Sequence, residues 1–297
     1  MNAVPLTPDL RAAWEAFCLK HPEAWFWSTP AWLEYELAHS GGRDLSFAMV
    51  EGGDILAICP LILEGDQFSM EGNPLPWPIA AYPTDGWAIW AMIDELAQKH
   101  GVKRAAFRGS PLVAEPGIFR HGYTDISWQS RVIDLTRPER DLHAALRKSY
   151  RSLINWGDRN LEIVVSRDRT LSSHYQRLHC QQAGRITRSP RTWFLMEEWE
   201  QTGNGLLIGA KMGDWVGFVY LILYKDGAYY ASGVSTLPNV MHSLQWAAIR
   251  ELKKRGVNRY ELGWQGHSNS PKEKSISWFK TGFGGGNVPL VAIEKYF

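Results

Sequence analysis

Apolar runs and turn-forming residues alternate in the same order in two segments of the chain, residues 52–66 and 212–226. The two segments superpose at a constant offset of 160 positions along the sequence. The matching positions are Gly53-Asp54 with Gly213-Asp214, Leu61-Ile62-Leu63 with Leu221-Ile222-Leu223, and Asp66 with Asp226. In each segment a Gly-Asp pair joins two apolar runs, which predicts a β-hairpin.

A second repeated pattern has the period of a helix. Residues 90–109, "WAMIDELAQKHGVKRAAFRG", are similar to residues 246–264, "WAAIRELKKRGVNRYELGW". In the second copy Leu244, Ala248 and Leu252 recur at helical spacing, and the cations at 253–255 lie where the helix dipole favours them. Gly256 is then expected to end the helix in a left-handed conformation, with a strand after it.

A third match pairs "FRHGY" at 119–123 with "FKTGF" at 279–283, again 160 positions apart. Each half therefore reads as hairpin, strand, helix, strand, short helix and strand. A strand-helix-strand passage makes neighbouring strands parallel. The predicted fold class is α/β with mixed α+β character: two tandem units, each a mixed sheet flanked by helices. We place the boundary near "TRPER" at 136–140, giving units 1–137 and 138–297.

Composition narrows the functional classes. The 297 residues are 45% hydrophobic, enough for a large core, and 32 Lys+Arg against 31 Asp+Glu argue against a surface that coats a long nucleic acid. The three cysteines and nine histidines show no metal-ligand spacing, and we expect no structural metal. No protease, lipase or P-loop motif is present.

The longest clearly apolar run, residues 216–223, is far shorter than the roughly 20 residues that span a membrane. The N-terminus lacks the basic and apolar regions of a signal peptide. We therefore expect no membrane span and a cytoplasmic protein. The sequence does not determine the oligomeric state.

The order of elements, with an aromatic-x-x-Gly-aromatic motif before the last strands, resembles the GNAT acyltransferase fold. Two such units in one chain resemble the FemAB family, which transfers aminoacyl groups from aminoacyl-tRNA to amines of peptidoglycan precursors. The segments that carry this resemblance span most of the chain: "WFWSTPAWLEYEL" (25–37), "LRKSYRSLINWGDRNLEIVV" (146–165), "HSLQWAAIRELKKRGVNRYELGWQG" (242–266) and "ISWFKTGFGG" (276–285).

The resemblance implies an N-acyltransferase that acts on a primary amine of a cell-envelope or polysaccharide precursor, small or carrier-linked. The donor would be aminoacyl-tRNA or acyl-CoA, with no permanently bound cofactor. The segment 235–246 lacks the glycine turn with which GNAT enzymes hold CoA pyrophosphate. The chain also has no heptad segment for the coiled-coil arm found in some FemAB members. Any contact with the acceptor end of a tRNA would therefore involve a compact surface. The alternatives are a CoA-dependent acetyltransferase of an amino sugar and a non-catalytic sugar-phosphate binding module.

Lys280 is the first candidate for catalysis. It resembles the lysine that FemAB enzymes place against the donor, and acyl transfer requires donors aimed at the developing oxyanion. The glycines at 282 and 284–286 are expected to let the backbone approach a ligand closely. The competing interpretation is a solvated lysine at a helix end followed by a flexible turn.

Further candidates lie on two strands of the second half. Tyr230 and Ser232 belong to the strand end where GNAT sheets splay, and strand alternation is expected to place both side chains on one face. Tyr230 could hold the acyl carbonyl or return a proton, or pack in the core. Glu261 could accept the amine's proton or be a satisfied carboxylate paired with Arg259 or with a backbone turn. Trp264 and Gln265 follow at the carboxyl end, where α/β sheets bind ligands.

Arginines gather before a helix that Ser189 caps and Pro190 begins. Arg185, Arg188 and Arg191 are candidate phosphate ligands, with solvent-facing loop residues as the alternative. In the first half, the proline-rich segment 71–87 contributes Trp77 and Tyr82 as candidate walls of an acceptor site. We expect the second half to hold the donor and the chemistry, and the first half to bind the acceptor or give support.

Overall fold

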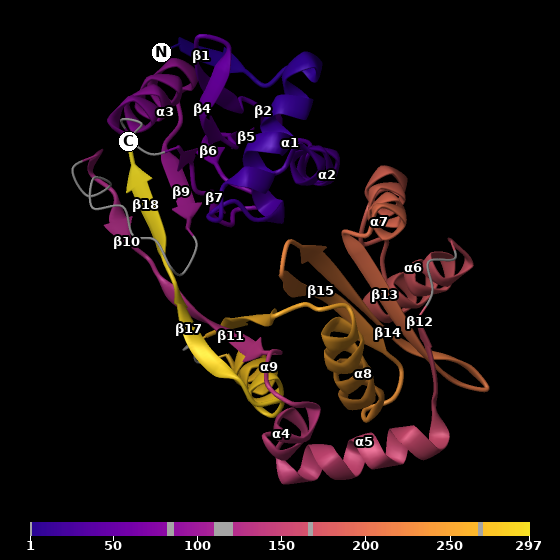
Figure 1. Ribbon diagram of the computed structural model, residues 1–297. Helices are drawn as coiled ribbons and strands as arrows, with labels where there is room; N and C mark the ends of the chain where they lie inside the picture. The colour runs from indigo at the N-terminus through magenta and orange to yellow at the C-terminus, as the bar shows by residue number, and fades with distance from the viewer. Residues whose placement is uncertain (1, 82–85, 110–120, 166–168, 267–269) are drawn as a thin grey trace. The chain divides into compact units, whose positions relative to one another are not determined.

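A computed structural model describes residues 2–81, 86–109, 121–165, 169–266 and 270–297 (Figure 1). The chain divides into two compact units. The first contains Met1–Trp128 and Pro289–Phe297, and the second contains Gln129–Val288. The boundary expected at 137/138 thus falls at 128/129, and the C-terminal strand returns to the first unit because it pairs there.

The first unit contains a four-stranded sheet in the order β1-β3-β4-β8 and the sheet β10-β18-β9-β6-β5-β2, with β7 also paired to β9. Its elements are β1 (Asn2–Pro5), η1 (Pro8–Leu10), α1 (Arg11–Lys20), η2 (Phe26–Ser28), α2 (Pro30–Ser40), β2 (Arg43–Asp44), β3 (Phe47–Glu51), β4 (Asp54–Cys59), β5 (Ile62–Glu64), β6 (Gln67–Phe68), β7 (Leu75–Pro76), β8 (Ile79–Ala80), α3 (Gly86–His100), β9 (Arg104–Arg108), β10 (Thr124–Asp125) and β18 (Ala292–Tyr296).

The second unit is built on one seven-stranded sheet in the order β12-β13-β14-β15-β16-β11-β17. Its elements are β11 (Trp128–Asp134), α4 (Glu139–Ala144), α5 (Lys148–Asn160), β12 (Glu162–Val165), α6 (Arg169–Ala183), α7 (Pro190–Thr202), β13 (Gly205–Met212), β14 (Asp214–Tyr224), β15 (Gly227–Ser235), α8 (Val240–Lys254), β16 (Arg259–Gln265), α9 (Pro271–Thr281) and β17 (Gly286–Leu290).

The predicted duplication is confirmed by matching details of the two units. Both Gly-Asp hairpins form, β3 with β4 and β13 with β14. The next turn of each unit has a residue with positive φ, Gly65 at 59° and Lys225 at 51°. In both units the strand after the turn runs parallel to the strand after the helix: β6 pairs with β9, and β15 with β16.

One sheet of each unit is completed by a strand that follows the other unit's elements in sequence. β11 lies between β16 and β17 in the sheet of the second unit, and β18 lies between β9 and β10 in the larger sheet of the first unit. β18 pairs with β9 along its whole length, from Ala292 opposite Arg108 to Tyr296 opposite Arg104. The hydrogen bonds of this ladder are the physical reason why the last strand belongs to the first unit.

Helices cover both faces of the sheet of the second unit (Figure 1). On one face, α8 packs its buried residues Val240 and Leu244 against Gly217 of β14. On the other, the Tyr220 hydroxyl of β14 donates to the Met196 carbonyl of α7, 2.8 Å away. As predicted, Gly256 ends α8 with a φ of 75°. In the described ranges no helix is long and apolar enough to span a bilayer.

Candidate active site in the second unit

The parallel strands β15 and β16 pair over only three residues and then part. Gly227–Tyr229 pairs with Arg259–Glu261, while β15 stays bonded to β14 as far as Ser235 and β16 to β11 as far as Gln265. We call the unpaired segments, residues 230–235 and 262–265, the β15–β16 fork. Backbone groups along such an edge can hydrogen-bond a ligand instead of a neighbouring strand.

A β-bulge in β15 corrects one expectation about the fork. Ser232 lies opposite Tyr220 and Tyr230 lies opposite Leu221, with the register shifted between the two pairs. The extra residue of a bulge reverses the alternation of side chains. Ser232 therefore shares a face with Tyr220, on the α6 and α7 side. Tyr230 packs against the opposite, α8 side of the sheet, so the prediction that the two share a face was wrong.

Tyr230 belongs to a buried polar group on the α8 side. Burial raises the pKa of its hydroxyl, and the neighbouring Gln245 amide opposes this only in part. Gln245 also accepts a 2.7 Å hydrogen bond from the Tyr260 hydroxyl. The Tyr230 hydroxyl consequently stays protonated at neutral pH, where it is able to donate a hydrogen bond but not to act as a base.

Lys280 lies beside the other arm of the fork. Its Nζ donates to the Trp264 carbonyl at 2.9 Å. Burial lowers the pKa of Lys280 to about 8, although the Glu261 carboxylate acts in the opposite direction. At Gly263, whose φ is 83°, a Cβ atom would lie 3.4 Å from both the Lys280 amine and the Tyr229 hydroxyl. The structure thus brings Lys280, Glu261 and the fork backbone together.

Glu261 is a satisfied carboxylate at this site. The Ser130 hydroxyl donates to Glu261 Oε1, whereas Arg259 pairs with Asp226 at 3.5 Å. The ion pair with Arg259 that we considered from the sequence is therefore not formed. Trp264 is half-buried and contributes its carbonyl group to Lys280. Gln265 is 5% exposed, and its amide nitrogen has no hydrogen-bond acceptor among the described residues.

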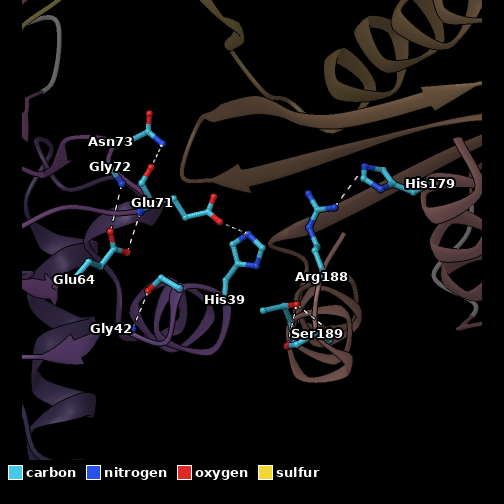
Figure 2. Close-up of polar contacts among 11 residues, drawn as sticks. His39, Gly42, Glu64, Glu71, Gly72, Asn73, His179, Arg188 and Ser189 are labelled. Atoms are coloured by element: carbon cyan, nitrogen blue, oxygen red, sulfur yellow. Dashed lines mark hydrogen bonds and ion pairs between the residues drawn. The ribbon is translucent and has the colours of Figure 1, made fainter. Parts of the chain in front are cut away.

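His179 on α6 is a candidate that sequence reasoning missed. Its Nε2 lies 3.3 Å from the Ser232 hydroxyl and 3.4 Å from Nη1 of Arg188, a contact drawn in Figure 2. Burial, Arg188 and Arg185 together lower the pKa of His179 to about 4. Histidine spacing gave no signal for this site, because the partners of His179 come from the α6–α7 loop and β15.

The predicted arginine group divides in the structure. Arg185 and Arg188 both act on His179, and the Arg188 guanidinium also lies over the Trp193 ring, 5.0 Å from its centre. Arg191 turns to the Phe194 ring, 5.2 Å away. Ser189 caps α7 as predicted, since its hydroxyl accepts from the Thr192 amide.

The glycine-rich segment after Lys280 serves internal packing. A Cβ at position 282 would overlap the Tyr150 ring, one at position 284 would press on Ala145, and one at position 285 would overlap the Val132 carbonyl. Only Gly286 of this segment faces open space. The expectation that these glycines form a wall against a ligand is therefore corrected: they let α9 and β17 approach α4, α5 and β11.

The first unit has no equivalent fork in its described part. After β6 pairs with Arg104 and Ala105, the short strand β7 pairs in parallel with Phe107 and Arg108. The Trp77 amide extends this ladder by donating to the Arg108 carbonyl at 2.8 Å. The backbone edge that is open in the second unit is thus occupied by the segment containing Trp77. Tyr82 lies outside the described residues.

A separate cavity of about 430 Å³ opens in the first unit, among residues of α2, β5 and the loop after β6. His39 Nε2 pairs with Glu71 Oε1 at 3.0 Å beside it. Glu64 accepts a hydrogen bond from the Ser69 hydroxyl. It also accepts from the amides of Glu71 and Gly72 (Figure 2). The polar side chains that line this cavity are therefore largely hydrogen-bonded or ion-paired to one another and to the nearby backbone. No group of side chains suited to a metal ion occurs in the described ranges.

Comparison with known proteins identifies the fold. No family model and no curated sequence matches the chain. Three solved structures resemble it over nearly its whole length. FemX is 12% identical with a TM-score of 0.72, covering 98% of this chain and 97% of that one. The C-terminal domain named as that of a lysylphosphatidylglycerol synthetase from Agrobacterium fabrum is 13% identical with a TM-score of 0.63, covering 97% and 92%. A tandem GNAT protein from the clavulanic acid biosynthesis pathway is 15% identical with a TM-score of 0.59, covering 99% and 98%.

Identity at this level establishes a shared fold and leaves the activity open. The chain has a tandem GNAT-like fold: the repeated pattern predicted the two units, and the resemblance implied their GNAT-like character.

Proposed function

We propose that this protein is an N-acyltransferase whose second unit binds an acyl or aminoacyl donor at the β15–β16 fork. The observation that carries the proposal is the fork itself, an open parallel ladder with a half-buried lysine at one arm. The names of the structural neighbours, which include FemX and a tandem GNAT protein, agree with this class of reaction.

Acyl transfer to an amine places negative charge on the donor's carbonyl oxygen as the nitrogen attacks. Fixed donors in a water-poor site stabilise that charge more strongly than water does. The fork offers the edge of residues 230–235 that does not pair with β16, and the cationic Lys280 lies nearby. With a pKa of about 8, Lys280 keeps most of its proton at neutral pH. Tyr230 is assigned as a hydrogen-bond donor toward the acyl or leaving group.

Glu261 supports this chemistry through charge, since its carboxylate favours the protonated form of Lys280. Because Ser130 already donates to it, we assign Glu261 this electrostatic role in place of general base. Trp264 and Gln265 line the β16 arm. Arg185 and Arg188 are assigned to a phosphate group of the donor or acceptor, since guanidinium groups suit phosphate geometry.

The donor is aminoacyl-tRNA or acyl-CoA, and the acceptor is a primary amine of a cell-envelope or polysaccharide precursor. The β15–α8 junction argues for aminoacyl-tRNA, since residues 235–246 contain no glycine for a pyrophosphate turn. The first unit is assigned to acceptor binding or support, with Trp77 in the segment that fills its ladder.

The test begins with thermal unfolding of the purified protein, incubated separately with acetyl-CoA and with aminoacylated tRNA. A rise in midpoint with one donor identifies it, because a ligand that binds only the folded state stabilises it. Transfer of a radiolabelled acyl group to a panel of primary amines then follows. Lys280→Ala is expected to lower turnover about 10²- to 10³-fold, whereas Lys274→Ala, at an exposed position of the same helix, leaves it unchanged.

Stabilisation by acetyl-CoA alone would establish a CoA-dependent acetyltransferase and exclude the tRNA donor. If neither donor stabilises the protein and neither supports transfer, the proposed enzymatic activity is refuted. That result would favour a binding module of the same fold, and titration with a nucleotide sugar would then test for binding. Equal activity of the Lys280→Ala and Lys274→Ala proteins would remove Lys280 from the site.

A further inference from the structure

Three polar contacts fix the imidazole of His179. Its Nδ1 lies 3.0 Å from the Thr187 hydroxyl. Its Nε2 lies 3.4 Å from Nη1 of Arg188 and 3.3 Å from the Ser232 hydroxyl oxygen. The ring is carried by α6, whereas its partners belong to the α6–α7 loop and β15, so the ring joins a helix layer to one arm of the fork.

The chemistry of the partners determines which nitrogen carries the proton. A guanidinium has donors and no acceptor, so the Nε2 that faces Arg188 must present its lone pair. The proton therefore resides on Nδ1 and is donated to the Thr187 hydroxyl. The neutral ring is favoured as well by burial and by the charges of Arg185 and Arg188. The second ring hydrogen of an imidazolium would point at the Arg188 guanidinium.

This tautomer orients the Ser232 hydroxyl. Because Nε2 can only accept, its one lone pair is shared by Arg188 and the Ser232 hydrogen, and the lone pairs of the Ser232 oxygen remain for another donor. Ser232 lies on the bulged part of β15, where the strand has parted from β16. The side chain is partly exposed. The fork thus presents a hydrogen-bond acceptor of fixed orientation.

We propose that Ser232 and His179 form the subsite for the attacking nitrogen of a neutral primary amine, with Ser232 accepting one N–H and His179 acting as the positioning residue. The inference rests on the proposed acyl transfer. An amine that gives one N–H to Ser232 has its lone pair directed elsewhere, toward the acyl carbon. The charges of Arg185 and Arg188 disfavour a further cation here, so the same surroundings that keep the imidazole neutral also keep the amine unprotonated.

The tautomer is tested on the whole protein without any substrate. Two-bond proton–nitrogen correlation spectra of the ¹⁵N-histidine-labelled protein at pH 7 are recorded, and the His179 signals are assigned by their loss in His179→Gln. We expect a neutral ring with the proton on Nδ1. A ring protonated on Nε2, or an imidazolium, would overturn the proposal.

The role is tested by steady-state transfer to glucosamine, ethanolamine and glycine amide with the donor selected above. Ser232→Ala and His179→Leu are expected to raise the KM for the amine about 3- to 10-fold, the effect of one lost hydrogen bond, and to leave donor binding unchanged. His179→Gln retains an acceptor at the position of Nε2 and is expected to behave nearly as wild type. His174→Gln, on the same helix, is the control.

Thermal unfolding of each variant separates loss of the subsite from loss of the fold. Wild-type transfer with an unchanged amine KM in Ser232→Ala and His179→Leu would overturn the inference and leave the acyltransferase standing. A His179→Gln protein as impaired as His179→Leu would also overturn the positioning role. If the wild type transferred to none of the amines, the proposed function would fail, and the subsite with it.

Discussion

The Lys280 amine is predicted to titrate near pH 8, and Glu261→Gln is predicted to lower that midpoint further. Burial is the larger influence on the lysine and the Glu261 carboxylate opposes it. When the negative charge of Glu261 is removed, only burial remains, and burial favours the neutral form of the Lys280 amine. Gln still accepts the hydrogen bond from Ser130, so the substitution changes charge with little change in shape.

The magnitude follows from the two pKa values. With a pKa of about 8, about 10% of Lys280 is neutral at pH 7, against about 0.03% of an ordinary lysine with a pKa of about 10.5. Loss of a neighbouring opposite charge shifts a pKa by about one unit or more. We therefore expect a midpoint near 7 in Glu261→Gln. An oxyanion-stabilising role for Lys280 would then be largely lost at pH 8.

The assay is competitive labelling with acetic anhydride between pH 6 and 11, followed by mass spectrometry of Lys280-containing peptides. Lys103 is an internal control in the same samples, because its ion pair with Asp66 raises its pKa. The reasoning is refuted if the Lys280 midpoint equals or exceeds that of Lys103, or if Glu261→Gln raises it.

Three further predictions concern stability, measured as the free energy of unfolding in urea. Burial raises the pKa of Glu200 to about 8. The stability contributed by its protonated carboxyl is therefore complete below pH 4.5 and is lost as the pH rises through 8. Glu200→Gln should flatten the decline in the free energy of unfolding between pH 5 and 9, and an unchanged slope would contradict this. Phe283→Ala should cost about 3–5 kcal/mol, because its side chain is 2% exposed in the core; a loss below 1 kcal/mol would contradict this. Gly282→Ala should destabilise strongly because its Cβ would overlap Tyr150, whereas the matched Gly286→Ala enters open space and should change stability by no more than about 0.5 kcal/mol; equal effects would refute the packing role of the glycine segment.

Local features of the sequence were sufficient for the repeated architecture. Gly-Asp turns, the αL glycine that ends α8 and the Ser-Pro start of α7 depend on conformational preferences of a few adjacent residues, and all three form as predicted. The same kind of reasoning wrongly assigned the C-terminal strand to the second unit. That β18 joins β9 of the first unit depends on strand pairing over nearly two hundred positions, and no local preference encodes this.

The candidate site was proposed partly from the sequence. Lys280 was chosen because its segment resembles that of FemAB enzymes, and the strands around it were expected from the order of elements; their roles in catalysis stay predictions. Whether Lys280 is a solvated helix end or a half-buried cation at Trp264 depended on how α9 packs against β16. The four glycines after it resembled a ligand-binding loop, because a sequence does not distinguish glycine required by a ligand from glycine required by Tyr150 or Val132.

The sequence by itself determined the duplicated units and their element order, since both follow from hydrophobic period and turn chemistry, whereas Lys280 in the last helix was chosen through the resemblance to FemAB enzymes. Only the tertiary structure decided the faces and partners of the site. One extra residue in β15 places Ser232 on the side opposite Tyr230, and the packing of α6 then brings His179 to within hydrogen-bonding distance of it. Alternation along a strand holds only while the ladder is regular, and a bulge is set by how neighbouring strands pair.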